Sequence, residues 1–260
     1  MSVPVLRGGA ATAIGSWPGT DGLEAARTVL GELEELPHLV ELPDRGVGAD
    51  MIGRTAAMLV DLPIDTSTTG YRLTDHPGAV LRRAQAHLAR DLDFAEEALE
   101  RAGVRGTGTP MKLQVAGPVT IAAELELRSG RRALTDPGAV RDLAESLAEG
   151  VRGHVHGVRR RFGVDPVVQV DEPSLPAALA GDLPGLTRFD SVPALPGPEA
   201  QALLGALVDA VDGAPVVVHG GGAAGAPVGL LRRLDVAAVS FFFGDGGAAG
   251  LAAGELDALG

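Results

Sequence analysis

The chain of 260 residues contains no cysteine. This absence excludes disulfide bonds, a cysteine nucleophile and any metal site built on thiolate ligands. Aromatic residues make up only 3% of the chain, so it offers little side-chain surface on which a nucleic-acid base or a flat cofactor could stack. Hydrophobic residues, at 45%, are numerous enough to bury a sizeable core.

Basic residues are scarce relative to acidic ones. The 22 lysines and arginines stand against 34 aspartates and glutamates, which gives a formal net charge of −12. This charge disfavours binding to phosphate backbones and acidic membrane surfaces. No run approaches the ~18 apolar residues of a membrane span, and the first residues lack the basic and apolar regions of a secretory signal. We therefore expect a cytoplasmic protein that acts on a small molecule, with no nucleic-acid or membrane partner.

Short apolar runs rich in β-branched residues alternate with long amphipathic stretches, which is the pattern of an α/β protein with a parallel sheet. Strands are predicted at 11–16, 38–41, 111–116, 167–170, 215–218 and 237–243. Helices are predicted after residue 21 and over 50–60, 77–102, from 118, 137–162, 199–211 and 227–234. The segment 63–75 is predicted as a loop, and 183–198 as a long loop between a strand and its helix.

These elements make six βα units in 260 residues. An eight-unit barrel typically takes ~250 residues or more, and with loops this long the two further units would need roughly 60–90 additional residues. The sequence therefore predicts one domain over residues 1–260, a (β/α)8 TIM-barrel type truncated after about six βα units. Because an unclosed barrel exposes sheet edges, we expect that the chain can self-associate through them.

Polar residues gather where the predicted strands end, at the end of a barrel that carries active sites. They are Ser16, Glu41, Gln114, Asp171, Glu172 and His219. Asp171 follows an apolar strand, and a carboxylate there can bind an ammonium group or act as a base; the alternative is that it only caps a turn. The His219 imidazole could bind zinc or shuttle protons, or it could simply be a hydrogen-bonded histidine.

Four segments in chain order carry a resemblance to a known family. They are AIGSWP at 13–18, GPVT at 117–120, QVDEP at 169–173 and VVH at 217–219. Together they resemble the strand-end motifs of the catalytic C-terminal barrel of cobalamin-independent methionine synthase, especially its short stand-alone relatives from high-GC bacteria. The resemblance implies methyl transfer from a folate to the homocysteine thiol, which a bound zinc converts to a thiolate.

The same resemblance implies a role for individual residues. In the family, the matching positions hold the carboxylate of the amino acid (Ile14, Gly15 and Ser16), its ammonium group (Asp171 and, as a second carboxylate, Glu41) and the zinc ion (His219). The substrate implied is homocysteine or methionine, with a methyl-folate as the second small molecule.

Of the zinc ligands that the resemblance implies, this sequence contains only His219. The next ligand of the family is a cysteine two residues later, where Gly221 stands. A carboxylate ligand is expected at the end of the sixth strand, where this chain has the segment 240–243, and Asp245 is a substitute nearby. The last ligand is a cysteine on an eighth strand. We therefore expect a degraded zinc site, and catalysis by this chain alone is an open question.

Two other functions fit the sequence. One is a barrel that binds an amino acid without catalysis. The other is a barrel enzyme like uroporphyrinogen decarboxylase, which needs arginines facing the acidic groups of its substrate. Finding Arg45 or Arg54 near Asp171 would favour that second alternative.

Overall fold

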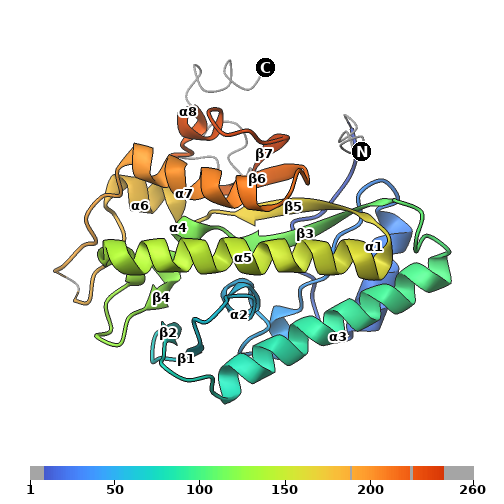
Figure 1. The fold of residues 1–260 in the computed structure, drawn as a ribbon, viewed down its shortest axis with the longest axis horizontal. Coiled ribbons are helices and arrows are strands. Elements are labelled where there is room, and N and C mark those ends of the chain that lie inside the picture. The colour runs from blue at the N-terminus through green and yellow to red at the C-terminus, as the bar shows by residue number, and fades with distance from the viewer. Residues whose placement is uncertain (1–8, 188, 223–224, 243–260) are drawn as a thin grey trace.

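Four parallel strands form the central sheet of the computed structural model, which describes residues 9–187, 189–222 and 225–242 (Figure 1). The strands lie in the order β3 (Pro110–Ala116), β5 (Asp165–Asp171), β6 (Val216–Gly222) and β7 (Ala238–Phe242). All four were predicted from their apolar runs. The strand β6 extends beyond its predicted end at residue 218, through three glycines, and its pairing with β7 shifts register between His219 and Gly222.

The predicted strands at 11–16 and 38–41 are present only as isolated bridges. His38 pairs in parallel with Lys112 of β3, and Ser16 pairs in parallel with Glu41. Pro37 and Pro43 bracket the second segment, and proline cannot donate a hydrogen bond to a ladder, which keeps the pairing short. The six segments still follow one another across the molecule in the order predicted for a barrel.

Helices connect these segments. They are α1 (Gly22–Glu32), α2 (Met51–Ala56), α3 (Ala79–Ala102), α4 (Pro118–Glu124), α5 (Pro137–Phe162), α6 (Leu175–Ala180), α7 (Gly197–Ala210) and α8 (Val228–Leu231), with short 3-10 turns at Pro43–Arg45 and Ala133–Thr135. Asp21 and Asp136 cap α1 and α5 by accepting hydrogen bonds from backbone N–H groups of the first turn. Gly103 and Gly163 end α3 and α5 in the left-handed conformation that glycine adopts without strain.

The prediction of a loop over 63–75 is wrong. This segment contains the antiparallel strands β1 (Ile64–Thr66) and β2 (Tyr71–Leu73), and β2 pairs in parallel with β4 (Leu125–Glu126). The strands are three residues or fewer, too short to show an alternating pattern. The helix α6 was also not predicted. It has only six residues and lies between a strand and a proline-rich loop.

The main hydrophobic core lies between the sheet and the helices that cover it. Met111, Leu113 and Val115 of β3 and Val168 and Val170 of β5 are buried in it, together with apolar residues of α3, α4, α5 and α7. Figure 1 shows α5 running along the sheet and α3 crossing below it. No helix within the described ranges is long and apolar enough to cross a membrane.

This architecture is a mixed α/β fold with a parallel sheet, consistent with a TIM-barrel-like domain. Closure of the barrel, the number of its units, the domain boundaries at 1 and 260 and self-association through open edges stay predictions.

Candidate functional site

Polar side chains share the face of the sheet opposite the main core. Gln114 of β3 is in register with Gln169 of β5, and Asp171 of β5 is in register with His219 of β6. Register partners in neighbouring strands point to the same face, and residues two apart on a strand share it. Lys112 therefore joins this set. Sequence analysis had selected Gln114, Asp171 and His219 at strand ends but missed Lys112 and Gln169.

The Gln169 amide connects two segments that are far apart in the sequence. Its Nε2 donates to the Ile14 carbonyl oxygen at 2.8 Å and to Asp171 Oδ1 at 2.7 Å. Its Oε1 accepts from Lys112 Nζ at 2.5 Å, and Lys112 also donates to the Ala13 carbonyl oxygen. The predicted carboxylate-binding segment and the predicted ammonium-binding residue therefore lie side by side.

Asp171 and Glu41 are both buried, with 6% and 5% of their surfaces exposed. Burial is the main cause that raises the pKa of Asp171 to about 8, and the nearby Glu41 carboxylate raises it further. Burial likewise raises the pKa of Glu41. Lys112 opposes both shifts, while its own burial lowers its pKa to about 8. A positive group entering here would favour the ionised form of both carboxyl groups.

The segment 14–16 passes directly beside Glu41. The backbone N–H of Glu41 donates to the Gly15 carbonyl oxygen at 3.1 Å, and the N–H of Trp17 donates to the Glu41 carbonyl oxygen at 2.8 Å. Gly15 is buried and has a φ of +125°, whereas Ile14 and Ser16 are exposed. Of this predicted trio, Gly15 is thus packed into the site, and Ile14 contributes its backbone carbonyl.

A buried ion-pair network backs Glu41. Arg54 of α2 lies 3.5 Å from Glu41 and also pairs with Asp91 of α3. Arg45 binds both oxygens of Asp91, at 2.6 and 2.7 Å. Both arginines of the decarboxylase alternative are therefore held by Asp91, and that alternative stays a prediction.

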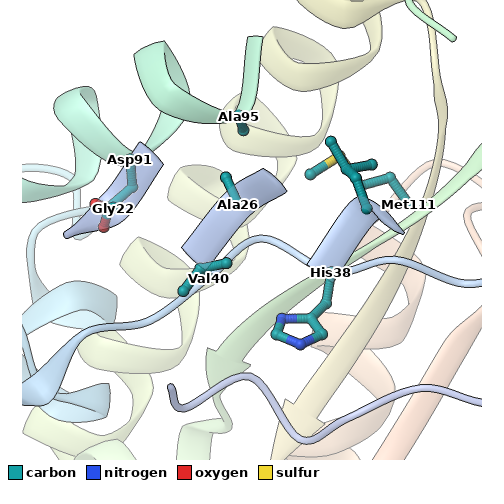
Figure 2. Close-up of a pocket in the computed structure, with 8 residues that line it drawn as sticks. Gly22, Ala26, His38, Val40, Asp91, Ala95 and Met111 are labelled. Carbon is teal, nitrogen blue, oxygen red and sulfur yellow. The ribbon is translucent and has the colours of Figure 1, made fainter. Parts of the chain in front are cut away.

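The small cavity beside this network is not a substrate site. It has a volume of about 10 Å³, roughly the space that one water molecule needs. Figure 2 shows the His38 ring directed away from α3, on which Asp91 and Ala95 lie. Burial lowers the pKa of His38 to about 4, so its imidazole is neutral.

Glu172 stabilises a helix end. Its carboxylate accepts hydrogen bonds from the backbone N–H groups of Val119 and Thr120, at 3.0 and 2.8 Å, and from the Thr120 hydroxyl at 2.7 Å. The side chain is fully buried, and this burial raises its pKa to about 7. These hydrogen bonds hold the GPVT segment against the end of β5. Glu172 therefore has a structural role next to the site.

The described residues do not fit a zinc site. His219 Nδ1 lies 2.9 Å from the Ser240 hydroxyl, and burial lowers the pKa of the imidazole. Gly221, where the family has a cysteine, packs against Pro173. Within residues 9–187, 189–222 and 225–242, no three histidines, aspartates or glutamates come close enough to hold a metal. The substitute ligand Asp245 lies outside the described residues. One imidazole does not make the four-ligand set that zinc requires.

A parallel sheet covered by helices, with Asp171 and His219 near the carboxyl ends of β5 and β6, is a mixed α/β architecture consistent with a TIM-barrel-like domain. The sequence model of the family described as cobalamin-independent synthase, catalytic domain, matches residues 10–217. The chain belongs to this family, which confirms the resemblance found in the sequence. The family is methionine-synthase-like, and the chain is therefore a methyltransferase-like protein. The match includes Glu41 and Asp171 and ends before His219.

The solved structures that are similar include a methyltransferase from Methanosarcina mazei, with 15% sequence identity and a TM-score of 0.49. The alignment covers 84% of this chain and 60% of that one, so the chain spans about 60% of the length of that structure. A comparison with curated proteins gives no match.

Proposed function

We propose that the chain binds a small α-amino acid of the homocysteine and methionine type at the carboxyl ends of its strands. The observation that carries the proposal is the buried pair Glu41 and Asp171. Burial raises the pKa of both carboxyl groups, and the Glu41 carboxylate further raises the pKa of Asp171. Burial makes both carboxyl groups costly to ionise, and the ammonium group of an amino acid would offset that cost. Family membership supports the same type of ligand.

The segment 14–16 would take the carboxylate of the ligand. It lies beside both residues, because the backbone N–H of Glu41 donates to the Gly15 carbonyl oxygen and the Gln169 amide donates to both Ile14 and Asp171. Ser16 is exposed at the same edge, and in this proposal its hydroxyl and backbone N–H hold the carboxylate. Lys112 acts indirectly, because it fixes the amide of Gln169 that orients Asp171.

The reaction implied by the family is methyl transfer from a folate to the homocysteine thiol. This transfer needs a thiolate, whereas a free thiol with a pKa of about 8.5 is mostly protonated at neutral pH. Because the described residues do not fit the zinc that would activate the thiol, the proposal rests on binding of the amino acid. Methyl transfer is the reaction class to assay next.

Isothermal titration calorimetry of the full chain with L-methionine and with L-homocysteine tests the proposal. We expect binding by the wild type and a loss of about tenfold or more in Asp171→Asn, because a hydrogen bond to a charged group contributes about 1.5–3 kcal/mol. Asp209→Asn, at an exposed position on α7, is the matched control and should bind as the wild type does.

Absence of heat with either amino acid at millimolar concentration, from protein with a folded circular dichroism spectrum, would overturn the proposal. So would equal affinities for the wild type and Asp171→Asn.

A further inference from the structure

Gln114 carries an unused buried amide. Only 6% of the residue is exposed, and neither Nε2 nor Oε1 has a hydrogen-bond partner among the described residues. Burying an amide without partners costs free energy, and native proteins leave few such groups. A ligand that supplies the missing partners would explain why this position holds glutamine on a strand whose neighbours are leucine and valine.

The side chain lies between the two halves of the proposed amino-acid site. On one side, Nε2 of Gln114 would be 2.7 Å from a Cβ atom placed on Gly15, so the amide packs directly over the segment that takes the carboxylate. On the other side, Gln114 is in register with Gln169, which bonds to Asp171. The amide therefore faces the position of the carboxylate and is adjacent to that of the ammonium group.

We infer that Gln114 contacts both charged groups of one amino-acid ligand, with Nε2 donating to the carboxylate and Oε1 accepting from the ammonium group. This inference rests on the proposed function. A glutamine amide has two donors and one acceptor oxygen, and a zwitterion supplies partners of both kinds. An amine leaves the donors unpaired, and a carboxylic acid leaves the acceptor unpaired. Gln114 is thus a specificity-determining residue that selects α-amino acids over ligands with a single charge.

Two substitutions separate binding from a purely structural role. Gln114→Leu removes both polar atoms at similar size, so we expect the Kd for L-methionine to rise about tenfold or more. We also expect the thermal midpoint of the ligand-free protein to rise, by about 2–4 °C for each kcal/mol of relieved cost. Gln201→Leu, on α7 with a surface partner in Arg233, is the matched control and should leave the Kd unchanged.

Gln114→Glu changes the charge and keeps an acceptor. Its test uses two analogues of methionine, the amine that lacks the carboxylate and the acid that lacks the amino group. We expect the variant to bind the amine at least as tightly as the wild type does and to bind the acid at least tenfold more weakly. A residue that only packs in the strand would shift both affinities in the same direction.

The outcomes distinguish this inference from the function on which it rests. If the wild type binds methionine and Asp171→Asn weakens binding, but Gln114→Leu does not, Gln114 has no contact with the ligand and the inference alone is wrong. Parallel shifts for the amine and the acid in Gln114→Glu would also overturn it. If the wild type binds neither methionine nor homocysteine, the proposed function itself fails.

Discussion

Asp91 neutralises two buried arginines, and its removal should be among the most damaging single changes in the chain. Its carboxylate binds Arg45 through both oxygens and pairs with Arg54, and its side chain is only 4% exposed. Asp91→Asn keeps the shape of the side chain and removes the charge. The substitution therefore tests the electrostatic contribution without creating a cavity.

The expected magnitude follows from what remains around each arginine. Breaking a buried ion pair by removing one partner costs about 3–5 kcal/mol, because an uncompensated charge is left behind. Here Arg54 keeps Glu41 at 3.5 Å, and 11% of the Arg45 side chain reaches solvent. Both facts favour the lower part of that range, so we expect a loss of about 3–4 kcal/mol. For a protein of this size, that loss of stability corresponds to a fall in the thermal midpoint of roughly 6–16 °C.

Asp93 provides a matched control on the same helix. It pairs with Arg161 at 2.6 Å, but 64% of its side chain is exposed. Exposed ion pairs contribute about 0–1 kcal/mol, so Asp93→Asn should change stability little. The assay is urea unfolding of the wild type and both variants, followed by far-ultraviolet circular dichroism at neutral pH. Equal losses for the two variants would refute the argument that burial makes the Asp91 pairs important.

Three further outcomes are expected. The folded-state pKa of Asp171 is raised from 3.8 to about 8, so between these pH values the native state binds more protons than the unfolded state and its stability should fall as the pH rises. Urea unfolding across this pH range should show a shallower fall in stability for Asp171→Asn than for the wild type. An unchanged slope in the variant would contradict the raised pKa of Asp171. Elemental analysis should find less than one zinc per chain in both the wild type and His219→Ala, whereas a full equivalent lost in the variant would reveal ligands outside the described residues. Gly15→Ala should destabilise the protein more than Gly19→Ala does in thermal melts, because both glycines have positive φ but only at Gly15 would a Cβ meet another side chain; equal effects would mean that the contact with Gln114 is unimportant.

The long helices and the central strands were predictable because their signals are local. A proline at its first position, an aspartate cap and a terminal glycine delimit α5 within the sequence itself, and the predicted bounds 137–162 agree with the structure. Gly103 marks the end of α3 in the same way. The segments 11–16 and 38–41 pair with each other and with β3 only through isolated bridges. Their pairing is weaker than predicted because register depends on neighbours that the local pattern does not contain.

The network behind Glu41 could not be predicted for the same reason. Arg54 lies on a short helix and Asp91 lies on a long charged one, where arginine and aspartate are usually solvated. Their burial results from the packing of α2 against α3 and β3. Sequence spacing between positions 41, 54 and 91 gives no indication of that contact.

The alternation along β3 did carry information about the site. Met111, Leu113 and Val115 belong to the hydrophobic core, whereas Lys112 and Gln114 lie on the opposite face. Both side chains are buried, and buried polar groups reduce stability unless they are hydrogen-bonded. Among the described residues, Lys112 is hydrogen-bonded to Gln169, whereas the Gln114 amide has no partner. A ligand that binds only the folded state stabilises it by RT ln(1 + [L]/Kd), where [L] is the concentration of free ligand. A ligand that pairs with the Gln114 amide should therefore offset the cost of burying it.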